Sequence, residues 1–197
     1  MLCHMFWLIC TSVLVYVSAY NTENIEYYSP QVYAYSRTYM CYGDNFTVYS
    51  VPENIRLNRT RCGIYIHKKE FKEPPRIIYT EANKKGLYTV MVGEAVKDFE
   101  TGWFYLLWLL VNIKGKDLII GNLEDADEFM PYFGPDPPKN MGPRTYQILL
   151  YYHRKKVPFK QQLPVRLRSN FDFFNWVRDQ HAQFQGPIAA TQFKIQT

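Results

Sequence analysis

The residue types that most often do chemistry in proteins are few and scattered in this chain. His67, His153 and His181 each stand alone, with no cysteine or second histidine at a spacing that would hold zinc. No serine or cysteine is accompanied by a recognisable histidine and aspartate partner, which a nucleophile needs for its activation. We therefore expect a protein that is not an enzyme and that holds no metal and no cofactor.

Charged side chains gather in two places, and neither has the pattern of a catalytic site. The first is an acidic stretch that we interpret as a solvated loop: Glu124, Asp125, Asp127 and Glu128. The second is the basic stretch 153–156, to which we add Arg166 and Arg168. This basic cluster could adhere to anionic vesicles or glycans, and such binding would be sensitive to salt. A solvated turn is the alternative, and the net charge of +5 fits either interpretation.

The first nineteen residues, MLCHMFWLICTSVLVYVSA, contain no Asp, Glu, Lys or Arg and end in small residues. This pattern predicts a secretory signal peptide that is cleaved after Ala19, although it lacks the usual basic start. An uncleaved anchor is the alternative, but the apolar part from Met5 to Val17 is shorter than the roughly 18 residues that span a bilayer. We expect a secreted, extracellular protein.

Cysteine use and glycosylation motifs agree with export. Cleavage would remove Cys3 and Cys10 and leave Cys41 and Cys62, which can form one disulfide in an oxidising compartment. Two buried free thiols are the alternative. Two sequons lie between these cysteines, and they begin at Asn45 and Asn58. Because a sequon is glycosylated only on an exposed site in the secretory pathway, we expect this loop to face solvent.

The elements that would position any site begin with an apolar run from Trp103 to Ile113, WFYLLWLLVNI, bounded by Gly102 and a Lys-Gly turn. Its length and aromatic content favour a strand buried on both faces, which we take as the central strand of the core. The whole chain has 197 residues, with 17 tyrosines and 13 phenylalanines. We expect a signal peptide over 1–19 and one β-rich domain over 20–197.

Further strands are expected around this run, with a lead-in over 21–37 lying against the domain. Alternation or apolar character predicts them at 46–49, 62–67, 76–79, 87–92 and 146–153. The stretch 125–138, rich in Asp and Pro, is expected to be a long loop without regular structure. A late helix is expected after a cap at Ser169 or Asn170, with Gly186-Pro187 ending it, and an alternating strand follows over 188–196.

Several of these segments in order resemble the phosphatidylethanolamine-binding protein family. They are LYTVMV, YLLWLLVNIKGKDLIIGN, PYFGPDPPKNMGPRTYQILLYY, and an FDF-containing helix followed by AATQF, and they cover roughly residues 74–197. The resemblance implies a mainly β fold, a sandwich of two antiparallel sheets with a C-terminal helix and short peripheral helices. We also expect a monomer that has no nucleic-acid partner and, once the signal peptide is removed, no transmembrane segment.

The family's pocket at one end of the sandwich implies a candidate site here. Its Asp-Pro-Asp-Ala-Pro loop falls on residues 93–97, where both aspartates are lost, and its His-Trp pair becomes Leu107-Trp108. Its Gly-x-His-Arg-Tyr segment becomes GPRTY, which keeps Gly142 and Tyr146 and loses the His-Arg pair. The candidate ligand-binding residues are therefore Trp108, Gly134, Asp136, Pro137, Pro138, Arg144 and Tyr146.

Arg144 and Asp136 decide what such a pocket could hold. Arg144 could bind an anion through two hydrogen bonds, could pair with Asp136, or could be a surface cation beside a pocket that has drifted. We expect a secreted, non-catalytic binding protein for a lipid, a phospholipid head group, or a small anionic or apolar ligand. The alternative is a protein-interaction module, of the kinase- or protease-regulating kind, that has lost the phosphate site.

Overall fold

The computed structural model describes residues 40–52, 55–95, 103–140 and 142–196. The expected signal peptide and the lead-in over 21–37 lie outside these described residues. Among the described residues, no helix is long and apolar enough to cross a bilayer.

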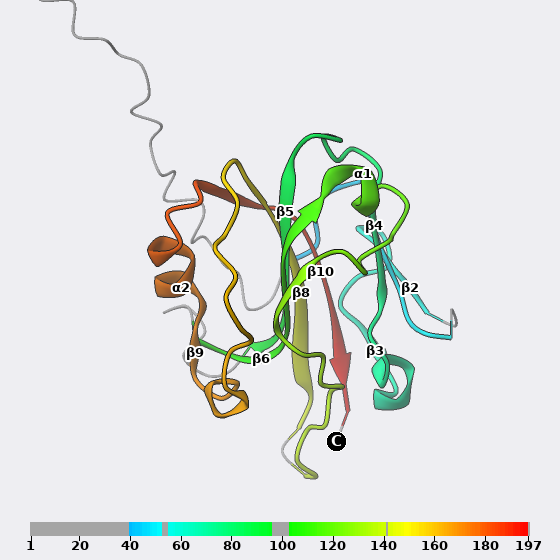
Figure 1. Ribbon diagram of the computed structural model, residues 1–197. Helices are drawn as coiled ribbons and strands as arrows, with labels where there is room; N and C mark the ends of the chain where they lie inside the picture. Colours follow the sequence, from blue (N-terminus) through cyan, green and yellow to red (C-terminus); the bar gives the residue numbers. More distant parts are fainter. Residues whose placement is uncertain (1–39, 53–54, 96–102, 141, 197) are drawn as a thin grey trace, which may run out of the picture.

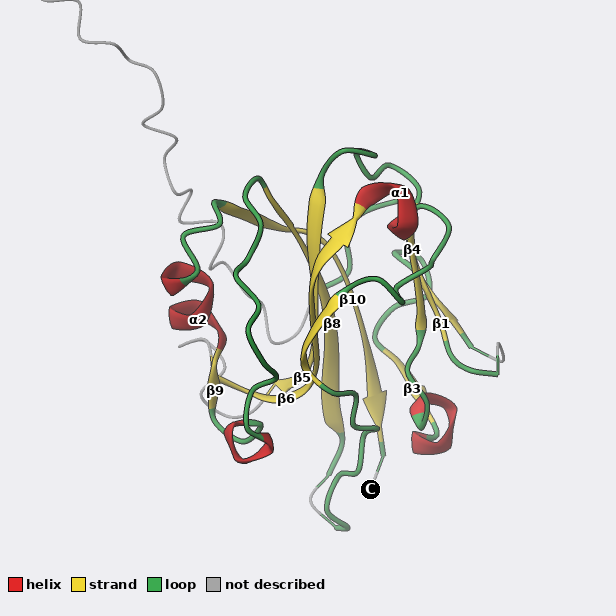
Figure 2. Ribbon diagram, in the orientation of Figure 1, coloured by secondary structure: helices red, strands yellow, loops and turns green. Residues whose placement is uncertain are grey.

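In the described part of the chain, ten strands build two sheets, and Figures 1 and 2 show their arrangement. The small sheet has the order β2-β1-β4, and its strands are β1 (Phe46–Tyr49), β2 (Arg56–Leu57) and β4 (Arg76–Tyr79). The large sheet has the order β3-β10-β8-β5-β6-β7, with β9 (Phe171–Asp172) paired to β6. Its other strands are β3 (Ile64–Ile66), β5 (Leu87–Ala95), β6 (Trp103–Lys114), β7 (Asp127–Met130), β8 (Arg144–His153) and β10 (Phe184–Ile195).

Both sheets are antiparallel except at one edge, where β3 runs parallel to β10. The predicted sandwich of two sheets is therefore confirmed, and the expectation that all pairs are antiparallel is wrong for this edge strand. A parallel pair needs a crossover between its strands. Here β4 to β9 lie between β3 and β10 in the sequence, so this long intervening chain provides the crossover that the parallel pair needs.

The large sheet is buried on both faces, which explains its long apolar strands. On one face, residues such as Val90 and Ile148 pack against Val48 and Ile77 of the small sheet. The other face is covered by the segment that carries α2 (Phe173–Asp179), with Phe173 and Val177 among its buried residues. The strand β6 is buried as expected, but β5 and β8 lie in the middle of the sheet, so the expectation of a central position for β6 is wrong.

Two other expectations about regular structure are wrong. The stretch 125–138 contains β7, because Asp127–Met130 pairs with β6 and buries Phe129 and Met130. The late helix is capped by Asp172, whose carboxylate accepts a hydrogen bond from the Asn175 amide at 3.0 Å. It ends at Asp179, and Gly186-Pro187 lies within β10 instead of terminating the helix.

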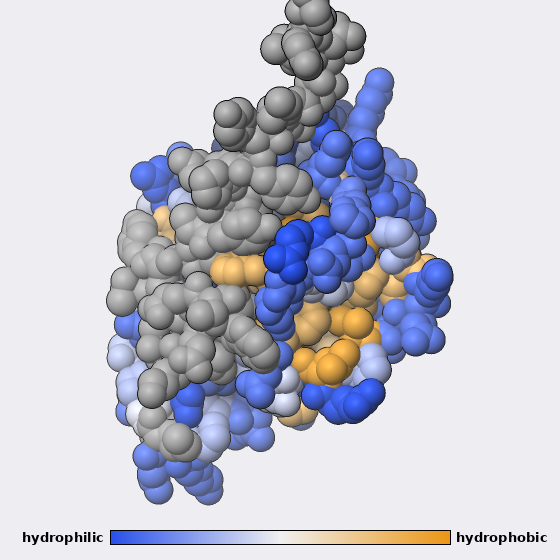
Figure 3. All heavy atoms as spheres, turned by 90° about the vertical axis from the view of Figure 1, so that its left-hand side faces the viewer, coloured by the Kyte–Doolittle hydropathy of each residue, from blue (hydrophilic) through white to orange (hydrophobic). Residues whose placement is uncertain are grey.

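Short helices occupy the periphery: η2 (Lys68–Phe71), α1 (Gly115–Leu118) and η4 (Val165–Leu167). On the face that carries α2, a small area of apolar side chains is exposed among polar ones (Figure 3). Val165 and Leu167 of η4 are exposed apolar residues.

Cys41 and Cys62 form a disulfide with a Cα–Cα distance of 5.9 Å, as the cysteine count predicted. The bridge joins the segment before β1 to the segment before β3. Between the two cysteines, Asn45 is exposed and Asn58 is half-buried. The described part of this loop therefore presents the Asn45 side chain to solvent and leaves that of Asn58 partly accessible.

Candidate functional site

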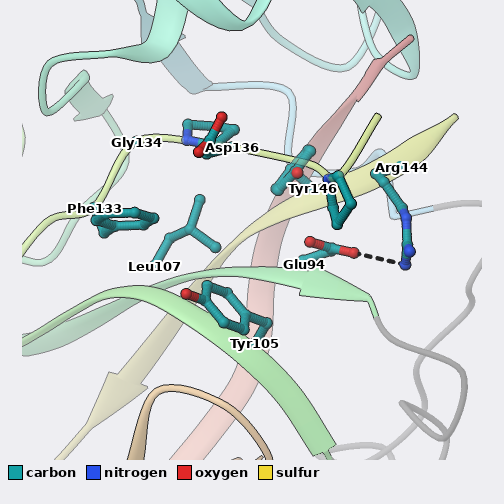
Figure 4. Close-up of a pocket in the computed structure, with 10 residues that line it drawn as sticks. Glu94, Tyr105, Leu107, Phe133, Gly134, Asp136, Arg144 and Tyr146 are labelled. Carbon is teal, nitrogen blue, oxygen red and sulfur yellow. Dashed lines mark hydrogen bonds and ion pairs between the residues drawn. The ribbon is translucent and has the colours of Figure 1, made fainter. Parts of the chain in front are cut away.

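A pocket of about 330 Å³ lies at one end of the large sheet (Figure 4). It lies where the end of β5 and the beginnings of β6 and β8 meet the loop 133–138. Its lining residues are Glu94, Tyr105, Leu107, Phe133, Gly134, Pro135, Asp136, Pro138, Arg144 and Tyr146. Apolar and aromatic side chains gather at one side, and Glu94, Arg144 and Tyr146 lie at the other. The pocket is therefore amphipathic.

The pairing of three strands places the polar groups together. Glu94 on β5 lies directly opposite Tyr105 on β6 and Tyr146 on β8. Directly paired residues bring their side chains within contact distance on one face. Arg144 precedes Tyr146 by two residues on β8, so it projects to the same face of the sheet. Four side chains from three strands thus converge at the end of the sheet.

A β-bulge in β6 shapes the apolar wall. Val92 pairs with Trp108 and Gly93 pairs with Leu106, so Leu107 is an extra residue on β6. The Leu107 carbonyl accepts a hydrogen bond from the Phe133 amide at 2.9 Å. The bulge therefore ties β6 to the loop 133–138 and brings Leu107 and Phe133 to the same wall.

Arg168 stabilises this wall through hydrogen bonds from the interior of the protein. Its Nη1 donates to the carbonyls of Leu106 and Leu107 at 2.7 and 2.8 Å, and its Nη2 donates to the Pro131 carbonyl at 2.9 Å. Its guanidinium also lies 5.3 Å from the centre of the Phe133 ring. Because the side chain is buried, the expectation that Arg168 joins a basic surface cluster is wrong. Burial also lowers the pKa of its guanidinium.

Arg144 pairs with Glu94, and the alternative of a pair with Asp136 is wrong. The Arg144 Nη1 and Glu94 Oε1 atoms are 3.0 Å apart, and both side chains are largely buried. Asp136 instead forms an exposed ion pair with Lys68 at 2.7 Å. Burial raises the pKa of Glu94, and the charge of Arg144 opposes this shift. The described lining thus contains two carboxylates and one guanidinium.

Tyr146 supplies a buried hydroxyl to the pocket. Its ring stacks on Phe193 with a centroid distance of 5.3 Å, and only 1% of the residue is exposed. The hydroxyl interacts with the Glu94 carboxylate. Burial, followed by the nearby Glu94 charge, raises the pKa of the phenol, so the group stays protonated at neutral pH. The phenol oxygen can in addition accept a hydrogen bond from a bound molecule.

Five of the seven residues predicted for the site line this pocket: Gly134, Asp136, Pro138, Arg144 and Tyr146. The other placements differ. Trp108 does not line this pocket; its indole Nε1 donates to Glu128 Oε1 at 2.8 Å. Pro137 lines a neighbouring hollow of about 400 Å³. The Asp136 carboxylate contacts Lys68 on the outer side of the loop.

Five lining residues were missed as candidates: Glu94, Tyr105, Leu107, Phe133 and Pro135. Alternation along β6 could have indicated Tyr105, which is two residues from Leu107. The role of Glu94 depends on its register with β8, which no short motif in the sequence reports.

The charged stretches found in the sequence have structural contacts. Asp127 accepts a hydrogen bond from the Asn112 amide, and Asp125 pairs with Lys114 at 3.0 Å. The acidic stretch is therefore partly engaged rather than wholly solvated. Within the described ranges, no group of three or more His, Cys, Asp or Glu side chains could hold a metal ion.

Comparisons with known proteins bear on the fold. No protein-family model matches the sequence. The chain is 31% identical over 133 residues to the Drosophila melanogaster protein named "Putative odorant-binding protein A5". The match covers 64% of this chain and 59% of that relative, so it spans less than two thirds of the relative's length.

Two solved structures resemble the described domain. A phosphatidylethanolamine-binding protein from Plasmodium vivax matches with a TM-score of 0.57 and 17% identity, over 76% of this chain and 84% of that one. A carboxypeptidase Y inhibitor, solved in complex with its cognate proteinase, matches with a TM-score of 0.53 and 16% identity, over 77% and 82%. The chain has the phosphatidylethanolamine-binding-protein fold, and it has a distant homologue in the Drosophila protein.

Proposed function

We propose that this chain is a secreted, non-catalytic protein that binds a small amphipathic molecule in the pocket at the end of the large sheet. The observation that carries the proposal is the pocket itself, in which the Tyr146 hydroxyl and the Glu94 carboxylate lie beside an apolar wall. A bound molecule could donate a hydrogen bond to these groups while its apolar part covers Tyr105, Leu107 and Phe133. The volume of about 330 Å³ suits a small molecule better than a whole lipid.

The names of similar proteins support this proposal. One solved relative in fold is titled a phosphatidylethanolamine-binding protein, and the Drosophila homologue is named for odorant binding. Both names refer to small-ligand binding. We therefore keep the expectation from the sequence that the ligand is a small molecule or a lipid head group. Among such ligands, one with a phosphate group is less favoured, because Arg144 already pairs with Glu94.

Secretion is part of the proposal and rests on separate observations. The disulfide between Cys41 and Cys62 suits an oxidising compartment. The exposed Asn45 side chain suits glycosylation, and the first nineteen residues have the composition of a signal peptide.

A protein-interaction module is the second candidate function. The carboxypeptidase Y inhibitor, which has the same fold, was solved with its proteinase. In this chain Val165 and Leu167 are exposed on η4, and Arg168, the residue that follows η4, lies against Phe133 at the pocket. These exposed apolar residues are what a protein partner could cover.

The test is a titration with the fluorescent probe N-phenyl-1-naphthylamine, compared across two matched variants. Phe133→Ala removes an exposed aromatic side chain from the pocket wall, and we expect it to weaken probe binding about 5- to 10-fold. Phe159→Ala removes a similarly exposed aromatic side chain that does not line the pocket, and we expect no change. A wild-type protein that does not bind the probe, or equal losses in both variants, would contradict the proposal and favour the interaction module.

A further inference from the structure

We infer that the polar group accepted by this pocket is a protonated primary amine, held by the Glu94 carboxylate and the Tyr146 hydroxyl, and that the pocket rejects phosphate and carboxylate. This inference rests on the proposed function and names the class of its ligand. The fitting molecule is a small primary amine on a compact aromatic or aliphatic body.

The charges of the lining support a cation. Glu94 is the acidic group at the polar side and Arg144 is basic, whereas the charge of Asp136 is offset by Lys68, and no lysine or histidine occurs among the described lining residues. The single guanidinium is already bonded to Glu94, with 3.0 Å between Arg144 Nη1 and Glu94 Oε1. An anion would have to displace Glu94 from Arg144 and then lie beside the released carboxylate. An ammonium group needs no such displacement.

The hydrogen-bonding capacity of the site also suits an amine. The bond to Arg144 engages Oε1 of Glu94, and the Tyr146 hydroxyl also interacts with this carboxylate, which has lone pairs to accept further donors. The phenol oxygen of Tyr146, which is directly across the strand pair from Glu94, can still accept a hydrogen bond. An ammonium group has three donors and no acceptor. It could donate to the carboxylate and to the phenol oxygen, leaving the phenol hydrogen to be donated to the carboxylate.

The apolar side of the pocket suits the body of such a molecule. Tyr105, Leu107 and Phe133 lie beside the polar group and not around it (Figure 4). An aromatic ring attached to the amine through two carbons could pack on Tyr105 and Phe133. Aromatic faces also attract cations, so this wall does not oppose the charge. For an anion, the same faces would be unfavourable.

The test uses three ligands that share an aromatic body and differ in the polar group. They are 2-phenylethylamine, 2-phenylethanol and 3-phenylpropanoate, and each is titrated against bound N-phenyl-1-naphthylamine at pH 8. We expect the amine to bind at least ten-fold more tightly than the alcohol, and the carboxylate to bind most weakly. Tighter binding of 3-phenylpropanoate than of 2-phenylethylamine would overturn the inference.

Two variants assign the effect to the predicted groups. Glu94→Gln should lower the affinity for 2-phenylethylamine at least ten-fold and change the affinity for 2-phenylethanol less than three-fold. Arg144→Gln should raise the affinity for 2-phenylethylamine, because it removes the cation that competes for Glu94. A misfolded protein could not show such a gain in affinity. The control is Asp125→Asn, which alters an exposed carboxylate paired with Lys114 away from the pocket and should leave all affinities unchanged.

The outcomes separate this inference from the proposed function. If the probe binds and the amine and alcohol displace it equally, the pocket binds ligands and the amine inference is overturned. If the probe does not bind to the wild-type protein, both are overturned. An amine preference that Glu94→Gln leaves intact would also overturn the inference, because the preference would then arise elsewhere.

Discussion

Replacing Arg168 with methionine should both destabilise the protein and loosen the pocket wall. Methionine keeps the apolar stem of the side chain and removes three hydrogen bonds to the carbonyls of Leu106, Leu107 and Pro131. Each hydrogen bond from a charged donor contributes about 1.5 kcal/mol at the lower end of its range, so the summed loss for the three bonds is roughly 4.5 kcal/mol. The exchange also loses the contact with the Phe133 ring, which adds about 1 kcal/mol at most.

Urea unfolding of the wild type and of Arg168→Met measures this loss directly. Arg166→Met is the matched control, because Arg166 is exposed two residues earlier in the same segment and should change the free energy of unfolding by less than about 0.5 kcal/mol. Arg168→Lys should fall between the two, since an ammonium cannot reproduce the planar set of donors. A loss below about 1 kcal/mol for Arg168→Met would refute the reasoning that this guanidinium holds β6 and the segment from Pro131 to Phe133 together.

Three further predictions concern stability. Replacing Cys41 and Cys62 together by alanine should lower the free energy of unfolding by about 3 kcal/mol, measured in urea, and a loss near zero would show that the bridge hardly constrains the unfolded chain. Burial lowers the pKa of His153 from 6.5, so the unfolded state binds a proton at a higher pH than the folded state does. The free energy of unfolding of the wild type should therefore fall relative to that of His153→Asn as the pH drops below 6.5. Parallel pH profiles of the two proteins would contradict this. Burial raises the pKa of Glu94 above 4.5, so the unfolded state loses its proton at a lower pH than the folded state does. The free energy of unfolding of the wild type should therefore fall relative to that of Glu94→Gln as the pH rises from 4.5 through the folded-state pKa. A rise over this pH range would contradict the prediction.

The long apolar strands and the fold could be predicted from the sequence because their patterns are local. The runs at 87–92, 103–113 and 146–153 become β5, β6 and β8, and the order of motifs identified the fold. The strand β7 was missed because Asp127 and Glu128 read as solvent-facing residues. In the structure, Asn112 and Trp108 donate hydrogen bonds to these two carboxylates. Such contacts depend on which strands become neighbours.

The candidate site could be predicted in part for the same reason. Motif spacing indicated the loop 134–138 and the segment with Arg144 and Tyr146, and these do meet at the pocket. The partner of Arg144 could not be predicted, because Glu94 is fifty residues away and reaches it only through the β5–β8 pairing. The burial of Arg168 also could not be predicted, since a lone arginine after an exposed segment has the pattern of a surface residue.

The most direct test of a small-molecule pocket is a crystal structure of the protein with 2-phenylethylamine. We predict that the amine nitrogen lies within about 3 Å of a Glu94 carboxylate oxygen and of the Tyr146 hydroxyl, with the ring against Tyr105 and Phe133. A ligand that binds with its nitrogen facing solvent would contradict the assigned polar group. A protein that binds the amine in solution but leaves the pocket at Glu94 empty would contradict the account of the site.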